Sequence, residues 1–195
     1  MRIRSAGILL LALVSFAARA DLGGSTLRLP QWPARAGTPD LHLTDTQGRA
    51  RTLEDFRGRV TIVYFGFVSC PDICPATLHK LALAGRALGH NADRLQVVFV
   101  TLDPEHDTPA QLDAYVRMTR LRATALTGTP ARIDEAAQAF SVQHAHIVSQ
   151  GAATIDHSGG LFIFDPGGQL RVVAPVSVSV PDLTHDLATL ASAAQ

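Results

Sequence analysis

The two cysteines of this 195-residue chain stand four positions apart, directly after an apolar run that has the length of a buried strand. That run, residues 60–67, is rich in β-branched and aromatic residues, which favour strands. Cys70 and Cys74 each precede a proline, and residues 76–88 have the composition of a helix. The thiols are therefore predicted at the carboxyl end of a central strand, where ligands bind in open α/β sheets. The adjacent helix N-terminus is expected to lower the pKa of a thiol beside it.

The rest of the chain predicts an α/β sandwich with a central mixed sheet, flanking helices and a C-terminal β-hairpin. Strands are expected at 41–45, 60–67, 95–102, 123–126, 142–148, 154–164 and 169–173, with a helical turn at 53–58 and helices at 76–88, 109–119, 130–140 and 181–194. Thr108 and Thr129 each precede a proline and are predicted helix N-caps. The turn residues at 165–168 join two strands that must run antiparallel, which makes the sheet mixed.

The N-terminus has the features of an export signal. Arg2 and Arg4 precede an apolar segment at residues 6–18, and residues 18–20 have the small-x-small pattern of a cleavage site. The apolar segment has about 13 residues, fewer than the roughly 20 that span a bilayer. We therefore expect an exported, periplasmic protein with a cleaved signal peptide. The alternative is that residues 6–18 anchor the chain to the inner membrane.

This organisation divides the chain into a signal peptide (1–20), an irregular lead-in (21–37) and one folded domain (38–195). Removing the signal would leave 14 basic and 17 acidic residues, a net charge of −3 with histidine neutral. Nucleic-acid binding requires a basic face, and the sequence offers none, so no nucleic-acid partner is expected.

Two cysteines in an exported protein most simply form a structural disulfide. A bridge between Cys70 and Cys74 would close a loop of about five residues and stabilise the fold by only about 2 kcal/mol. A local dithiol at a strand-to-helix turn better fits reversible thiol chemistry or metal binding. Two thiols do not complete a structural zinc site, whereas two thiolates and one imidazole suit copper.

A third copper ligand must come from one of eight histidines. His157 differs from the others in its surroundings, because Asp156 precedes it and two glycines follow Ser158. A neighbouring carboxylate can orient an imidazole, and glycines permit a sharp turn or a close backbone approach. His144 and His146 would face one side of a strand, which is more typical of a solvated hairpin than of a second copper site.

Four motifs match the Sco/SenC family in order and spacing. They are Phe65-Gly-Phe-Val-Ser-Cys70-Pro-Asp-Ile-Cys74-Pro75, Val100-Thr-Leu-Asp103-Pro-Glu-His-Asp107-Thr-Pro109, Leu126-Thr-Gly-Thr-Pro130 and Asp156-His157-Ser158. The chain thus resembles this family over roughly residues 38–190. The resemblance implies a thioredoxin-like fold of the peroxiredoxin type and copper, as Cu(I) or Cu(II), bound by Cys70, Cys74 and His157. It also implies a role in assembling the dinuclear copper centre of cytochrome c oxidase.

The resemblance implies that the partner is the copper-site subunit of cytochrome c oxidase or another copper protein. It also implies that the protein acts close to a membrane. Asp103, Asp107 and Asp156 are candidates for hydrogen bonds that orient the metal ligands. The alternative for Asp103 and Asp107 is that they only shape and cap their loop. The sequence departs from the family in two places. Residues 150–154 lack the tyrosines that usually precede the Asp-His-Ser motif, and the N-terminus has a cleavage pattern where the family often keeps a membrane span.

Three functions compete for the same cysteines. A copper metallochaperone, which is not an enzyme, would hold the ion and pass it on by ligand exchange. A thiol–disulfide oxidoreductase would cycle Cys70 and Cys74 as a redox-active pair, with less need for His157. A peroxidase is disfavoured, because that chemistry wants a Thr or Ser three residues before the reactive cysteine, and Phe67 and Pro71 stand there.

Overall fold

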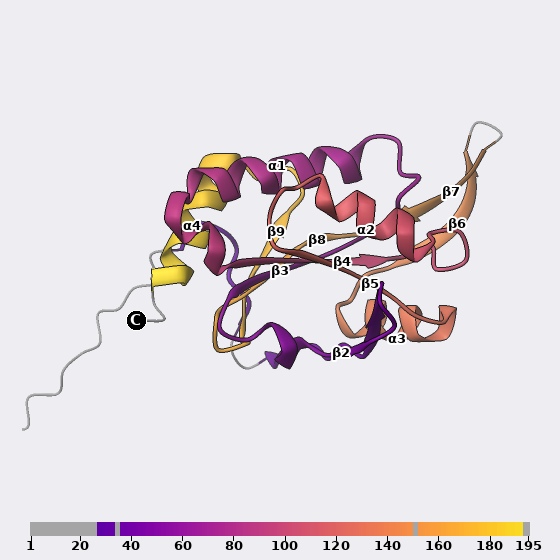
Figure 1. Ribbon diagram of the computed structural model, residues 1–195, viewed down its shortest axis with the longest axis horizontal. Coiled ribbons are helices and arrows are strands. Elements are labelled where there is room, and N and C mark those ends of the chain that lie inside the picture. Colours follow the sequence, from indigo (N-terminus) through magenta and orange to yellow (C-terminus); the bar gives the residue numbers. More distant parts are fainter. Residues whose placement is uncertain (1–26, 34–35, 150–151, 193–195) are drawn as a thin grey trace, which may run out of the picture.

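The computed structural model describes residues 27–33, 36–149 and 152–192, so the expected signal peptide lies outside the described residues (Figure 1). Seven strands form a central sheet in the order β2-β1-β5-β4-β3-β8-β9. They are β1 (Leu43–Asp45), β2 (Ala50–Arg51), β3 (Val60–Gly66), β4 (Leu95–Thr101), β5 (Ala123–Thr127), β8 (Gly160–Phe164) and β9 (Leu170–Pro175). β3 and β4 pair in parallel, whereas β3 pairs antiparallel with β8, which confirms the predicted mixed sheet.

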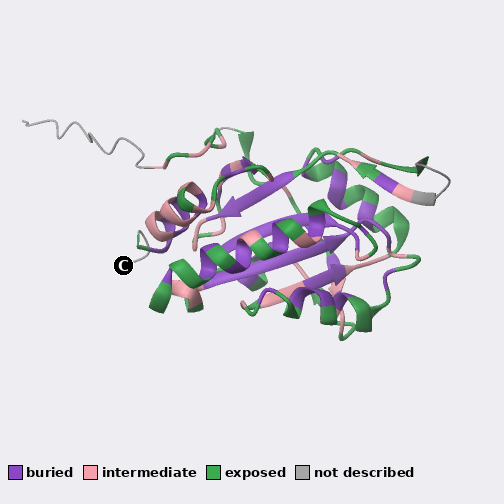
Figure 2. Ribbon diagram, turned by 90° about the horizontal axis from the view of Figure 1, so that it is seen from above, coloured by how far each residue is buried: buried purple, intermediate pink, exposed green. Residues whose placement is uncertain are grey.

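Helices cover both faces of this sheet. They are α1 (Ile73–Ala87), α2 (Pro109–Arg117), α3 (Pro130–Ala139) and α4 (Val180–Ser192), with 3₁₀ turns at Leu53–Phe56 and Gly89–Arg94. α1 packs beside α4 on one face, and α3 lies on the other (Figure 1). Every residue of β3 and β4 is buried, because both faces of these strands are covered (Figure 2). Their sequences are accordingly continuous apolar runs rather than alternating ones.

The predicted strand at 154–164 is wrong, because the chain forms two strands there. β7 (Ala152–His157) pairs with β6 (His144–Ser149) in a separate hairpin that projects from the body, while β8 joins the central sheet (Figure 1). A Cβ on Gly160 would lie 2.6 Å from the carbonyl oxygen of Ala174, so only glycine allows β8 to begin this close to β9. His157 is therefore the last residue of a strand at the junction between two sheets.

Helix α1 begins at Ile73, three residues before the predicted start. Pro75 is tolerated there because the amides of the first helical turn have no intrahelical acceptor. Cys74 consequently lies inside the first turn of the helix, while Cys70 lies in the loop before it.

Part of the expected lead-in packs against the domain. The fully buried carboxylate of Asp186 in α4 accepts hydrogen bonds from the backbone amides of Arg28 and Leu29 at 2.8 and 2.9 Å. Gln31 then forms a β-bridge with Val172 of β9. Residues 28–31 thus follow the outer edge of the central sheet and have defined partners there.

Asp45 at the end of β1 should stabilise the fold only above acidic pH. Burial raises the pKa of Asp45, but hydrogen bonds from Gln47, Arg49 and Arg51 outweigh burial and lower it from 3.8 to about 2. Since the folded pKa lies below the unfolded one, this stabilisation is complete above about pH 4 and is lost as the pH falls towards 2. Asp45→Asn should lower the free energy of unfolding by about 1–2 kcal/mol at pH 7, as urea titration can measure.

The difference in the free energy of unfolding between Asp45→Asn and the parent should become smaller as the pH falls from about 4 to 2.5. A matched control is Asp40→Asn, because Asp40 pairs with His42 at the exposed surface and should contribute little. A deficit for Asp45→Asn that stays constant from pH 7 to pH 2.5 would contradict the ionic explanation.

Candidate metal centre

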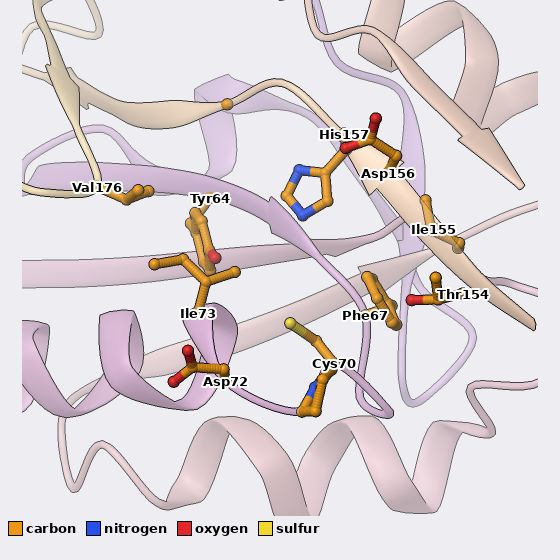
Figure 3. Close-up of a pocket in the computed structure, with 12 residues that line it drawn as sticks. Tyr64, Phe67, Cys70, Asp72, Ile73, Thr154, Ile155, Asp156, His157 and Val176 are labelled. Carbon is orange, nitrogen blue, oxygen red and sulfur yellow. The ribbon is translucent and has the colours of Figure 1, made fainter. Parts of the chain in front are cut away.

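Cys70 and His157 line the same cavity, which has a volume of about 290 Å³. Figure 3 shows the sulfur of Cys70 and the imidazole of His157 pointing into it from facing walls. The other lining residues are Tyr64, Phe67, Pro71, Asp72, Ile73, Thr154, Ile155, Asp156, Gly159 and Val176. The carboxyl end of β3, the start of α1 and the strand β7 therefore converge here, as predicted for a site at the end of a central strand.

The two cysteines are free thiols with different access to the cavity. Cys70 is 9% exposed and lines the cavity, whereas Cys74 is fully buried and is not among the lining residues. The backbone amide of Cys74 donates a hydrogen bond to the sulfur of Cys70 at 3.4 Å, which ties the loop to the first turn of α1. A molecule that enters the cavity meets Cys70 first.

Gly66, the last residue of β3, makes room for the buried sulfur of Cys74. A Cβ at this position would lie 2.9 Å from Cys74 Sγ and 3.1 Å from a ring carbon of Phe99. Both distances are shorter than ordinary contacts between such atoms, which are about 3.5–4 Å. The Cys74 sulfur can therefore occupy this position only because Gly66 has no Cβ.

Burial raises the pKa of the Cys74 thiol from 9.0 to about 12. The sequence predicted a lowered thiol pKa at the helix N-terminus, and for Cys74 that prediction is wrong. The reason is that desolvation disfavours the thiolate of a fully buried sulfur more strongly than the helix end favours it. A metal ion that binds Cys74 must therefore displace a proton.

His157 is held at the rim of the cavity by its own neighbours in sequence. Its Nδ1 lies 3.1 Å from the carbonyl oxygen of Ser158. An imidazole that donates from Nδ1 leaves the lone pair of Nε2 available to a metal. Ser158 also accepts a hydrogen bond from the amide of Gln143 and donates its own amide to the carbonyl of Gln143, which closes the base of the hairpin. Ser158, rather than Asp156, is thus the residue that contacts the imidazole nitrogen.

The three candidate carboxylates have different surroundings. Asp107 is buried and accepts hydrogen bonds from the amide of Val68 at 3.0 Å and the hydroxyl of Thr101 at 2.6 Å, so it fixes the loop that carries Cys70. Burial raises the pKa of Asp107. Asp103 is also buried, but its carboxylate bonds to the exposed ring of His106 at 2.7 Å. Asp156 is exposed at the cavity wall.

Two of the three copper ligands predicted from the sequence, Cys70 and His157, share a cavity, but the three side chains are not within metal-bonding distance of one another. Among residues 27–33, 36–149 and 152–192, no three Cys, His, Asp or Glu side chains are near enough to hold a metal ion. Cys70 and His157 share a cavity, and Cys74 lies behind Cys70. His144 and His146 line a different recess, where Nε2 of His144 pairs with Asp134 at 3.1 Å.

The sequence reasoning missed three residues of the site: Tyr64, Gly66 and Ser158. The alternation of a strand offered a signal for the first two, because residues 64 and 66 of β3 must lie on the same face. That face was not identifiable from the sequence, since both faces of β3 are buried. Ser158 was visible in the sequence as part of the Asp-His-Ser motif, but its role was not, because its partner Gln143 is 15 residues away.

A comparison with protein-family models identifies the family of this chain. The SCO1/SenC family model matches residues 32–192. The chain belongs to the SCO1/SenC family. The resemblance stated from the motifs is thereby confirmed, and so is the thioredoxin-like α/β fold.

Relatives in this family include copper proteins. A putative copper-binding protein of Stutzerimonas stutzeri is 34% identical over 141 residues, which cover 71% of this chain and 69% of the relative. The human mitochondrial SCO2 homolog is 36% identical over 143 residues, which cover 69% of this chain and 52% of that protein. The chain thus spans about half the length of this mitochondrial relative.

A solved structure agrees with both the fold and the expected cofactor. The crystal structure of Arabidopsis thaliana ScoI with copper bound has a TM-score of 0.70 and 31% sequence identity, and the match covers 79% of this chain and 96% of that one. None of the helices in the described part of the chain is long and apolar enough to cross a membrane.

Proposed function

We propose that this protein binds one copper ion through the thiolates of Cys70 and Cys74 and the imidazole of His157. It then passes the ion to a copper protein during assembly of the dinuclear copper centre of cytochrome c oxidase. The observation that carries the proposal is the cavity into which the sulfur of Cys70 and the imidazole of His157 both point (Figure 3). The buried Cys74 adjoins Cys70, because its backbone amide donates a hydrogen bond to the Cys70 sulfur.

The donor set fits copper chemically. Two soft thiolates and one imidazole suit Cu(I), which is satisfied by a low coordination number. The imidazole has to move towards the sulfurs to complete the set, and it lies directly before Ser158 and two glycines, where the chain leaves one sheet for another. Copper is the cargo that the protein delivers. An incomplete coordination shell around the ion favours delivery, because a ligand from the client can bind before a ligand of this protein leaves.

The unequal burial of the cysteines sets an order for copper transfer. Cys70 lies at the cavity surface, so a thiolate of the client can replace it first. Cys74 is fully buried and is the last protein ligand to leave. The client in this proposal is the copper-site subunit of cytochrome c oxidase, and the protein acts outside the cytoplasm after export.

The test is the ligand count of the copper-loaded, reduced protein by X-ray absorption. The unsubstituted protein should bind one copper with two sulfur ligands and one nitrogen ligand. His157→Ala should lose the nitrogen ligand and at least about tenfold in copper affinity, since even residues that only support a metal ligand contribute that much. His146→Ala is the matched control, because His146 is exposed on the neighbouring strand β6. Full affinity of His157→Ala would remove His157 from the ligand set.

A second function, a thiol–disulfide oxidoreductase that keeps partner cysteines reduced, is favoured by the unequal exposure of the thiols. An accessible thiol attacks a partner disulfide and a protected thiol resolves the mixed disulfide, and Cys70 and Cys74 fit these two roles. In the metal-free protein, Cys70→Ser should abolish reduction of a client disulfide, and Cys74→Ser should trap a mixed disulfide at Cys70. His157→Ala should leave the rate unchanged. A rate that depends on His157 would contradict this second function.

A further inference from the structure

Three buried hydroxyl groups near Cys74 have no hydrogen-bond partner: Tyr64 Oη, Thr77 Oγ1 and Tyr115 Oη. Only two other buried side-chain N or O atoms of the described residues are in this state. Thr77 lies one helical turn after Cys74, and the ring of Phe99 packs against both tyrosines at centroid distances of 6.0 and 5.3 Å. A buried hydroxyl without a partner costs free energy, so its concentration at one place requires an explanation.

The hydroxyl of Tyr64 interacts with the buried sulfur of Cys74. Tyr64 precedes Gly66 by two residues on the same face of β3, and the space above Gly66 is filled by Cys74 Sγ. Its side chain also lines the cavity together with Cys70 (Figure 3). The Tyr64 hydroxyl is near enough to the Cys74 thiol to interact with it, yet it has no hydrogen-bond partner by distance and angle.

Loss of the Cys74 thiol proton on copper binding would give the Tyr64 hydroxyl a hydrogen-bond acceptor. A protonated thiol is a weak acceptor, whereas an ionised acceptor forms a hydrogen bond about twice as strong as a neutral one. When copper binds, the Cu–S bond forms, the S–H bond breaks and the proton leaves to solvent. The sulfur of Cys74 then carries the negative charge that a buried hydroxyl donor can stabilise.

We infer that Tyr64 is a positioning residue of the copper site, whose hydroxyl donates a hydrogen bond to the Cys74 sulfur once copper has replaced the thiol proton. The inference rests on the proposed copper function and adds a determinant of the copper oxidation state. A hydrogen bond to a ligating sulfur withdraws electron density from it, and the environment of the cysteine sulfur tunes copper potentials. Because Cu(II) needs that electron density more than Cu(I) does, Tyr64 favours Cu(I).

The first test is Tyr64→Phe, which removes the hydroxyl and keeps the ring. The ratio of Cu(II) to Cu(I) affinity should rise about tenfold, the change that corresponds to one hydrogen bond to a charged group. The sulfur-to-Cu(II) charge-transfer band should move to longer wavelength. The metal-free variant should be at least as stable as the parent, because the hydroxyl has no partner there.

Tyr115→Phe is the matched control, since it removes a buried hydroxyl of the same kind that lies across the ring of Phe99. It should leave the affinity ratio and the absorption band unchanged. If Tyr115→Phe shifts the band as much as Tyr64→Phe, or if Tyr64→Phe destabilises the metal-free protein as much as it changes copper binding, the inference is overturned.

A second measurement keeps Tyr64 in place and strengthens its donor. The chain has two tyrosines, so in the Tyr115→Phe protein a biosynthetically incorporated monofluorotyrosine labels position 64 alone. The more acidic hydroxyl should shift the band to shorter wavelength, opposite to Tyr64→Phe. The same direction of shift for both changes would contradict a hydrogen bond to the sulfur.

The outcomes separate this inference from the proposed function. If the parent protein binds no copper, or binds it without two sulfur ligands, the proposed function itself fails. If the parent binds copper with two sulfurs and one nitrogen but Tyr64→Phe leaves the band and the affinity ratio unchanged, only the inference about Tyr64 fails.

Discussion

Gly66→Ala should cost the protein most of its copper affinity and also destabilise the metal-free fold. The added Cβ would stand 2.9 Å from Cys74 Sγ and 3.1 Å from a ring carbon of Phe99, so the sulfur must move from its place behind Cys70. Overpacking of this kind costs about 1–3 kcal/mol. We expect copper affinity to fall at least about tenfold, as for other changes that displace a metal ligand.

A double-substitution cycle identifies the contact responsible. In the Cys74→Ala background the sulfur is gone, so Gly66→Ala should cost less stability than in the parent, and urea titration of the four metal-free proteins measures the difference. Gly85→Ala is the matched control, because its Cβ would clash with a methyl carbon of Leu121 near the other end of α1. It should change stability without changing copper affinity. Equal losses of copper affinity in Gly66→Ala and Gly85→Ala would assign the effect to general destabilisation.

Asp107→Ala should loosen the loop that carries Cys70. The substitution leaves the amide of Val68 and the hydroxyl of Thr101 without their acceptor. Each buried donor left unsatisfied costs about 1–3 kcal/mol, so we expect the two to lower the free energy of unfolding by about 2–6 kcal/mol. Val68 is two residues before Cys70, so alkylation of Cys70 should become faster and copper affinity should drop.

The control for Asp107 is Asp103, four residues earlier in the same loop. The carboxylate of Asp103 is also buried, but its partner His106 is largely exposed, so water can replace the lost acceptor. Asp103→Ala should therefore lower stability by less than about 1 kcal/mol and leave Cys70 alkylation unchanged. Unchanged alkylation of Cys70 in Asp107→Ala would show that the loop is held by other contacts.

Local chemistry made much of the fold predictable. The N-caps at Thr108 and Thr129 are present, and each side chain accepts a hydrogen bond from the backbone amide three residues on. The apolar runs of β3 and β4 are buried on both faces, and the turn at 165–168 joins two antiparallel strands. These features depend on residues close to one another in the sequence, so their patterns are visible in it.

The failures have a common cause in contacts between distant segments. The run from Thr154 to Phe164 has the composition of one strand, but the close approach of Gly160 to Ala174 and the bonds between Ser158 and Gln143 divide it between two sheets. The pKa of Cys74 was expected to fall because the helix N-terminus was visible in the sequence. The burial that raises the pKa of Cys74 is not visible in the sequence, because it depends on tertiary packing, which also brings Tyr115 of α2 near Cys74.

The sequence by itself determined the chemical inventory: a pair of thiols between a strand and a helix, a histidine in an Asp-His-Ser motif and the α/β order of the elements. The tertiary structure decided which of these groups face each other. It placed the sulfur of Cys70 opposite His157 in one cavity, buried Cys74 behind it against Gly66, and fixed the loop through Asp107. The physical reason is that side-chain type follows from local sequence, whereas burial, distance and hydrogen-bond partner depend on the packing of segments that are remote along the chain.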